Sequence, residues 1–423
     1  MKILIANKYY FMKGGAERLL FNTKAVLEAH GHEVVPFAVR FARNEPTPHA
    51  RYFVDPPAGE DAVQLEQFRL RPANVPRMML TAFYSPQARR RIREAIRRER
   101  IDLVYMINVS NYISPSIVDG AHAEGVPVVH ALVDYHLVCP NATFNRPGKD
   151  RCLDCFPGKY WHGVVHRCVG RSLAASAMRA AVMFFDDLTH IYHRVDAFVC
   201  LTPFMRDVLE RRGFERSKLH VALTPIDCTG SRVGAEDDGT FLYIGRVSRE
   251  KGIDVLVEAA KLMRSWNSRV LIIGETSGRY ARECVARAAR GGGAPVEFLG
   301  PRYGDEMLGY LRRCRATVMP SRCIDNLPNA LLESFAVGKP IVGSDYEGIT
   351  VVVRDGENGL IFRPGDPADL AAKLDALAGN VDRARQMGLA GRRLVEAEHS
   401  PERHYESLMA AFEAARAHRT PAD

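Results

Sequence analysis

This sequence has no hydrophobic run that could cross a membrane. The apolar stretch at residues 173–185 is interrupted by Arg179, and a spanning helix needs about 20 apolar residues. The first residues are too quickly polar for a signal peptide. Short repeats and low-complexity tracts are also lacking. We therefore expect a soluble cytoplasmic protein, at most peripheral on the inner face of the cytoplasmic membrane.

Neither sign of charge dominates the chain. Its 423 residues include 58 Lys and Arg against 50 Asp and Glu, a net charge of +8. This modest excess permits phosphate-bearing ligands or an anionic membrane surface as partners. It does not require a nucleic acid, and we expect none. Hydrophobic residues make up 47% and charged residues 26%, a balance that excludes a disordered chain and gives ample material for full-sized cores.

Short apolar strands alternate with helical segments along most of the chain. The pattern predicts strands at residues 2–6, 32–35, 101–105, 126–129, 197–200, 241–245, 270–274, 296–300, 316–319 and 340–343. Strands that alternate with helices indicate parallel sheets with crossover helices. The predicted fold class is therefore α/β, with two tandem doubly wound, Rossmann-like domains. Their predicted bounds are 1–230 with an insert at 139–168, a linker at 231–239, a second domain at 240–398 and a terminal helix within 399–423.

A glycine-bounded basic loop follows the strand predicted at 241–245. Residues 245–252 read Gly-Arg-Val-Ser-Arg-Glu-Lys-Gly and lie where a strand gives way to a helix, the edge at which doubly wound sheets bind ligands. Arg246 and Lys251 could converge there on one diphosphate, because Arg offers a fork of donors and Lys a point charge. The alternative is a surface loop with scattered charges.

An acidic pair lies further along, after the strand predicted at 316–319. Asp325 and Glu333 are eight residues apart, and a helix is predicted to begin at Asn326. The free N–H groups and positive end of that helix would suit a phosphate. Glu333 would lie about two turns in, where a carboxylate can accept bonds from two sugar hydroxyls. Alternatively, Asp325 is an N-cap and Glu333 a solvated helix residue.

Together these motifs resemble the retaining nucleotide-sugar glycosyltransferases of the group 1, or family four, type. The resemblance extends to Gly-Lys-Pro at 338–340, to residues 344–349 and 355–360, and to the glycine loop Gly-Gly-Ala-Glu at 14–17. It implies the glycosyltransferase-B fold, in which two domains face each other across the active-site cleft. It also implies that the terminal helix returns to the N-terminal domain.

The resemblance implies roles for individual residues. Arg246 and Lys251 would hold the donor diphosphate, and Glu333 would bind the ribose hydroxyls. Asp325 would face the donor sugar and counts with Arg246 and Lys251 as catalytic. The remaining donor-binding candidates are Gly15, Gly245, Asn329 and Ala330.

Two departures from the family pattern concern the reacting groups. The first acid of the pair is usually Glu, and here it is Asp325. The family also commonly has His where this chain has Val133. On the acceptor side the candidates are Glu17, Asp134 and His136.

The implied reaction is a retaining transfer of a sugar to a hydroxyl acceptor, a saccharide or lipid-linked saccharide in the synthesis of bacterial cell-surface polysaccharide such as lipopolysaccharide. Catalysis would need no metal or other cofactor, because the sequence has no Asp-x-Asp metal motif in a suitable loop. The alternatives are a nucleotide-sugar epimerase and a catalytically inactive protein that binds sugar nucleotides.

Four cysteines in the insert have metal-ligand spacing. Cys139, Cys152, Cys155 and Cys168 form the pattern Cys-x12-Cys-x2-Cys-x12-Cys, which suits a tetrahedral structural zinc. An iron–sulfur cluster and four unligated thiols are the alternatives. A disulfide framework is not expected in a reducing compartment.

A basic stretch lies at residues 68–100. Seven arginines fall within 89–100, and apolar residues precede them at 78–84. Such a pattern fits contact with anionic lipid. The alternative is a solvated helix with Ile92 and Ile96 packed inward.

Overall fold

A computed structural model describes residues 1–56, 75–110, 112–146, 148–234, 236–265 and 267–419. The start of the predicted basic stretch (68–74), one residue of the insert, one of the linker and the last four residues lie outside this part. The chain forms two compact units. Unit 1 comprises Met1–Ala142, Leu153–Pro225 and Pro401–Asp423, and unit 2 comprises Thr143–Cys152 and Ile226–Ser400.

Unit 1 is built on a parallel sheet of six strands in the order β2-β1-β3-β4-β5-β6. The strands are β1 (Lys2–Ala6), β2 (Glu33–Phe37), β3 (Leu103–Met106), β4 (Val128–Leu132), β5 (Ala197–Cys200) and β6 (Leu219–Val221). The order reverses between β1 and β3. Pro36 is tolerated in β2 because that strand is at the edge of the sheet, where a missing N–H donor leaves no ladder bond unmade.

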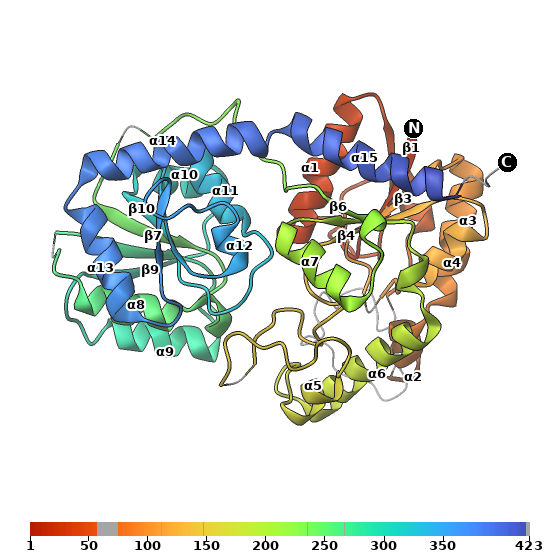
Figure 1. Cartoon of the computed structure of the whole chain (residues 1–423), viewed down its shortest axis with the longest axis horizontal. Helices are drawn as coiled ribbons and strands as arrows, with labels where there is room; N and C mark the ends of the chain where they lie inside the picture. Colours follow the sequence, from red (N-terminus) through yellow and green to blue (C-terminus); the bar gives the residue numbers. More distant parts are fainter. Residues whose placement is uncertain (57–74, 111, 147, 235, 266, 420–423) are drawn as a thin grey trace. The chain divides into compact units, whose positions relative to one another are not determined.

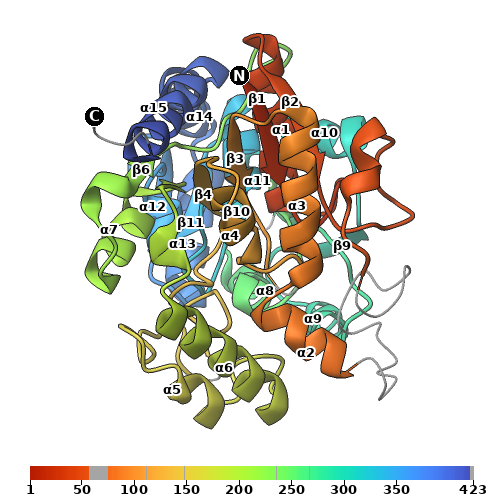
Figure 2. The ribbon, with the colours of Figure 1, turned by 90° about the vertical axis from the view of Figure 1, so that its right-hand side faces the viewer.

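Eight α-helices of unit 1 lie within the described residues: α1 (Gly15–Ala29), α2 (Val75–Phe83), α3 (Pro86–Glu99), α4 (Ser116–His122), α5 (Trp161–Val165), α6 (Leu173–Thr189), α7 (Pro203–Arg212) and α15 (Pro401–Arg419). Local sequence signals determine where several of these helices begin or end. At α7, the Thr202 hydroxyl accepts from Met205 N, Pro203 is the first helical residue, and Gly213 ends the helix in the left-handed region. Helices α2 and α5 both pack against α6 (Figure 2). No described helix is long and apolar enough to span a bilayer.

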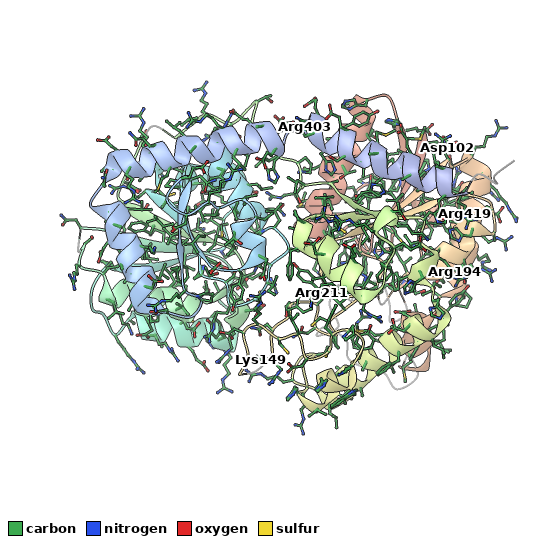
Figure 3. The ribbon with its side chains drawn as sticks, viewed as in Figure 1. Asp102, Lys149, Arg194, Arg211, Arg403 and Arg419 are labelled. Carbon is green, nitrogen blue, oxygen red and sulfur yellow. The ribbon has the colours of Figure 1, made fainter. Side chains whose placement is uncertain are left out.

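The last helix, α15, belongs to unit 1. Phe412 is fully buried among core residues of β1, β3 and β5. His404 hydrogen-bonds the Thr23 hydroxyl and the Leu223 carbonyl oxygen. At the end of the helix Arg419, labelled in Figure 3, pairs with Asp196 at 3.4 Å. Hydrophobic burial and polar contacts along its length therefore attach α15 to this unit.

Unit 2 repeats the same plan with a parallel sheet in the order β12-β11-β10-β7-β8-β9. The strands are β7 (Thr240–Ile244), β8 (Arg269–Ile273), β9 (Val296–Gly300), β10 (Ala316–Met319), β11 (Ile341–Ser344) and β12 (Gly359–Phe362). The order reverses between β7 and β10. In Figure 1 the strands lie among helices α8 (Ile253–Leu262), α9 (Arg279–Ala288), α10 (Gly304–Arg313), α11 (Asn329–Ala336), α12 (Glu347–Thr350), α13 (Pro367–Ala378) and α14 (Val381–Glu398).

The units divide at places that differ from the predicted domain bounds. The first break falls after Pro225 rather than after residue 230, and the insert at 139–168 is split, because Thr143–Cys152 packs with unit 2. The side-chain amide of Asn145 donates to the Arg322 carbonyl oxygen at 2.7 Å, and Asp150 pairs with the Arg322 guanidinium. These polar contacts explain why the segment goes with unit 2. Lys149 marks it in Figure 3.

Candidate functional site: two loops of unit 2

Two loops meet at the carboxyl edge of the unit 2 sheet, one after β7 and one after β10. These strands are neighbours at the point where the strand order reverses. Doubly wound sheets bind ligands at this position, because the flanking connections leave in opposite directions and open a crevice. The loop after β7 carries Arg246 and Lys251, and the loop after β10 carries Asp325. The sequence motifs therefore lie at the place where the fold favours a ligand.

The close approach of the two loops requires Gly252. This residue has φ +68°, and a Cβ atom on it would lie 1.8 Å from the Pro320 carbonyl oxygen. Beside it, the Arg322 N–H donates to the Glu250 carbonyl oxygen at 2.8 Å. A side chain at position 252 would have to push the loops apart. The glycine thus fixes the distance between the two charged segments.

Lys251 and Asp325 form an ion pair across the junction. Lys251 Nζ lies 2.5 Å from Asp325 Oδ1, and the Ser321 hydroxyl donates to Asp325 Oδ2 at 2.6 Å. Burial opposes both charges, but the partners outweigh it: the pKa of Lys251 is raised and the pKa of Asp325 is lowered. Both groups are therefore charged near pH 7 and are held in place without a ligand.

Arg246 occupies a more open position than Lys251. Its side chain is 74% exposed and lies 3.4 Å from Glu250. Its backbone is held by the Tyr243 hydroxyl, which donates to the Arg246 carbonyl oxygen. Gly245 precedes it with a positive φ, and a Cβ there would lie 2.8 Å from the Tyr243 oxygen. The loop backbone is thus fixed while the guanidinium remains accessible to an anion.

Helix α11 begins directly after the Asp325 loop. Leu327 has φ +54°, a conformation that costs a non-glycine residue about 1–2 kcal/mol, and it is buried at the loop's centre. The turn it makes leads through Pro328 into α11, which begins at Asn329, followed by Ala330, and not at the predicted Asn326. Glu333 follows one turn later and is partly exposed. The predicted donor-binding residues of this segment therefore share one short helix.

Arg322 is a charged member of this loop that the sequence motifs did not single out. Its guanidinium pairs with Asp150 at 2.7 Å and with Asp254 at 3.2 Å. Asp150 belongs to the cysteine-bearing insert, about 170 residues earlier in the chain. No local spacing signals such a contact. The insert thus contributes a carboxylate beside the β10 loop.

In unit 1 the glycine loop follows β1, again beside the reversal of strand order. Gly15 is the first residue of α1. Glu17, in its first turn, is buried and accepts from the Asn7 side chain at 3.1 Å. Burial and, to a lesser extent, Lys13 lower the pKa of Lys8 to about 7, and its ammonium lies 4.1 Å from the centre of the Tyr112 ring. Lys8 is a buried basic group that no sequence motif singles out.

Asp134 and His136 form a second pair in unit 1, after β4. His136 Nδ1 lies 2.6 Å from Asp134 Oδ1, and the His136 N–H donates to the same oxygen at 3.0 Å. His130 is fully buried within β4, and burial keeps its pKa well below the ordinary value. His136 is therefore the histidine of this region that is hydrogen-bonded to a carboxylate and lies beyond the strand.

The four cysteines of the insert do not form a metal centre in the described part of the chain. No group of three or more His, Cys, Asp and Glu side chains there is placed to hold a metal ion. Cys152 ends the segment that packs with unit 2, whereas Cys139, Cys155 and Cys168 belong to unit 1. Cys139 Sγ donates to the Asn141 side chain at 2.9 Å. The zinc site stays a prediction from spacing.

Six of the seven arginines at 89–100 lie on α3, Arg100 follows its last residue, and much of their charge is paired. Arg93 and Arg97 both contact Glu124 at 2.6 Å, and Arg91 and Arg98 contact Glu94. Ile92 and Ile96 of the same helix are buried. These contacts agree with the alternative of a solvated helix that packs through its isoleucines.

Two family profiles match the chain. The profile described as glycosyl transferases group 1 matches residues 231–394, and the one described as glycosyl transferase 4-like domain matches residues 14–223. A curated relative, the D-inositol 3-phosphate glycosyltransferase of Nocardia farcinica, is 32% identical over 44% of this chain and 45% of its own length. The matching region thus spans about half the length of such curated relatives.

Solved structures resemble the chain over nearly its whole length. Sucrose-phosphate synthase from Thermosynechococcus elongatus has a TM-score of 0.71 at 18% identity and covers 98% of each chain. HepE of Anabaena, in complex with UDP-glucose, has a TM-score of 0.64 at 14% identity and covers 98% of this chain and 100% of its own. At these identities the likeness shows the fold.

Proposed function

The chain belongs to the group 1 glycosyltransferases and has the glycosyltransferase-B fold, and from this premise we propose that it transfers a sugar from a nucleoside-diphosphate donor to a saccharide hydroxyl. The observation that carries the proposal is the junction of the β7 and β10 loops. Gly252 permits these loops to approach closely, and Lys251 and Asp325 form an ion pair between them. HepE, a protein of the same fold, binds UDP-glucose. The UDP-glucose bound by HepE supports the proposal that this chain also uses a nucleotide-sugar donor.

In the proposed complex, Lys251 and Arg246 donate hydrogen bonds to the donor diphosphate. Negative charge grows on the leaving phosphate oxygen as the bond to the sugar breaks. Preorganised cations therefore stabilise the transition state more than they stabilise the bound substrate. Lys251 is already fixed by Asp325, whereas the exposed Arg246 can close onto the ligand. The Glu333 carboxylate on α11 accepts hydrogen bonds from the two ribose hydroxyls.

We further propose that the anomeric configuration is retained. The acceptor attacks from the face that the diphosphate leaves, and the departing phosphate oxygen takes the acceptor's proton. Asp325 acts in this scheme by accepting a hydrogen bond from the donor sugar. Its two oxygens already face Lys251 and Ser321, an arrangement that suits positioning better than covalent attack.

We propose that donor binding through these residues needs no divalent cation, because Arg246 supplies a positive charge and the Lys251 ammonium, whose charge Asp325 balances, supplies hydrogen-bond donors to the diphosphate. We therefore propose that catalysis is metal-independent. The acceptor side is assigned to unit 1, with Glu17 and the Asp134–His136 pair as its polar groups. The acceptor class we propose is a saccharide, including lipid-linked saccharides of bacterial polysaccharide synthesis.

Product analysis tests this function. Purified chain is incubated with UDP- and GDP-sugars, with and without saccharide acceptors, and NMR of the anomeric proton identifies the linkage. The acceptor panel includes inositol 3-phosphate, which the name of a relative indicates. We expect a new glycosidic bond with retained configuration that survives EDTA. An isomerised sugar formed without acceptor would instead identify an epimerase, and the absence of any turnover of a bound donor would indicate an inactive binding protein.

A further inference from the structure

Helices α5 and α6 form a hairpin that has its own small core. Tyr160 and Ala180 are buried there with Met183, and Val164 packs against them. The ring of Tyr160 lies 5.1 Å from that of Phe184. The side of each helix that faces the other is therefore accounted for by packing within the hairpin, and Phe184, which is 44% exposed, lies at the border of that side.

The outer face of α6 is also apolar. Five of its six exposed positions are spaced four, four, three and four residues apart, which places them on one side of the helix: Leu173, Ala177, Ala181, Phe184 and Leu188. Leu188 is 80% exposed and Leu173 is 54% exposed. A solvated helix would carry polar residues on this side, so packing within unit 1 does not explain this face.

Helix α5 adds to this surface, which we call the hairpin face. Trp161 and Val165 are four residues apart and are 52% and 64% exposed. Helix α2 packs on the other side of α6, where the rings of Phe83 and Phe185 meet edge-on at 5.4 Å, and it carries the exposed Leu80. Figure 2 shows α5, α6 and α2 next to one another.

Cations outnumber acids in the hairpin. Residues 155–189 contain four cations, Lys159, Arg167, Arg171 and Arg179, and two acids, of which Asp186 is buried and Asp187 pairs with Arg212. Arg167 and Arg171 are exposed in the connection between the two helices. Cations beside an exposed apolar face, with Trp, Phe and Leu on that face, are typical of helices that lie in the interface of an anionic bilayer.

We propose that the hairpin face is a membrane-contact surface that lies flat on an anionic leaflet. Its length fits this placement, because the 17 residues of α6 extend about 26 Å along an axis parallel to the surface. A second copy of the chain is the less favourable occupant, since two hairpins of the same positive charge would repel. The proposal moves the membrane contact from the paired arginines of α3 to α5 and α6. It does not depend on the donor site, and its test uses no nucleotide.

Trp161 supplies a direct reporter for the test. The chain has two tryptophans, so a Trp266→Phe background leaves Trp161 as the sole emitter. The full chain is mixed with vesicles of equal parts phosphatidylglycerol and phosphatidylcholine, and with vesicles of phosphatidylcholine alone. We expect co-sedimentation and a blue shift of emission with the anionic vesicles, both weakened by salt.

Two double variants separate the apolar and charged contributions. Leu173→Gln/Leu188→Gln leaves the charge unchanged and should weaken vesicle binding about tenfold or more. Arg167→Gln/Arg171→Gln should remove most of the preference for anionic vesicles. Leu262→Gln is the matched control, because Leu262 is 52% exposed in unit 2 and its change should leave binding intact. Circular dichroism checks that each variant is folded.

Three results would overturn the proposal. The first is absence of binding to either vesicle by the folded chain. The second is binding that the leucine pair does not affect. The third is a doubled mass in light scattering that the leucine pair abolishes while vesicle binding is absent, which would identify the face as a dimer contact.

Discussion

Replacing Asp186 by Asn should stabilise the protein increasingly as pH rises. Asp186 lies on the buried side of α6, and its Oδ1 has no hydrogen-bond partner among the described residues. Burial raises the pKa of Asp186 from 3.8 to about 7; Arg179 opposes this shift and Asp187 adds to it. Between pH 3.8 and about 7, the folded chain therefore holds a proton on Asp186 that the unfolded chain has lost.

The sign and size of the effect follow from this difference in bound protons. Between pH 4 and 7 the folded state binds more protons than the unfolded state, so the wild type loses stability as pH rises. Each pH unit contributes about 1.4 kcal/mol. Asn does not titrate, so its advantage over Asp should grow by about 2 kcal/mol between pH 5 and 7 and reach about 4 kcal/mol above pH 7.

Urea unfolding followed by Trp161 emission in the Trp266→Phe background measures this difference. The control is Asp187→Asn, because Asp187 pairs with Arg212 at 2.5 Å and its loss should not stabilise the hairpin. If the free energy of unfolding changed with pH in the same way for wild type and for Asp186→Asn, the reasoning would be refuted. That result would mean that the Asp186 carboxyl is ionised in the folded state without a loss of stability.

Four further variants test other parts of the account. Glu333→Gln should weaken binding of the nucleoside diphosphate about tenfold in calorimetry and leave turnover at saturating donor closer to wild type; unchanged affinity would remove Glu333 from the site. Asp325→Asn leaves the Lys251 ammonium without its carboxylate and should lower the free energy of unfolding by about 1–3 kcal/mol in urea titrations, whereas no loss would mean that water already solvates the pair. Phe412→Ala should cost about 3–5 kcal/mol and lower the melting temperature of unit 1, and a neutral result would contradict the packing of α15. Metal analysis tests the cysteine pattern: about one zinc or iron per chain, lost in Cys152→Ser, would support it, and a folded metal-free chain would refute it.

Much of the fold could be predicted because central strands of a parallel sheet are buried on both faces and therefore read as continuous apolar runs. The strands predicted at 197–200 and 316–319 match β5 and β10. The two strands that were missed, β6 and β12, have three and four residues and lie at sheet edges. Edge strands pair on one side only, and they need not carry the continuous apolar run by which the equally short central strands β5 and β10 were recognised.

The candidate site could be predicted only where its residues belong to one local motif. The Lys251 loop and the Asp325 loop each have a recognisable spacing, but their contact depends on Gly252 meeting Pro320 across the sheet edge. The pairing of Arg322 with Asp150 joins segments that no sequence period connects. Contacts set by tertiary packing leave no local pattern, and for this reason Arg322 and Lys8 were missed.

Calorimetric binding of UDP and GDP to the full chain, wild type and variant, tests the central claim most directly. Arg246→Ala/Lys251→Ala removes the two cations assigned to the diphosphate, and Lys261→Ala is the control, because Lys261 lies in the last turn of α8 and contacts Glu258. The account predicts binding of at least one nucleotide by wild type and by the control, with affinity reduced about a hundredfold or more in the double variant. Equal affinity in all three proteins, or no nucleotide binding by the wild type, would contradict it.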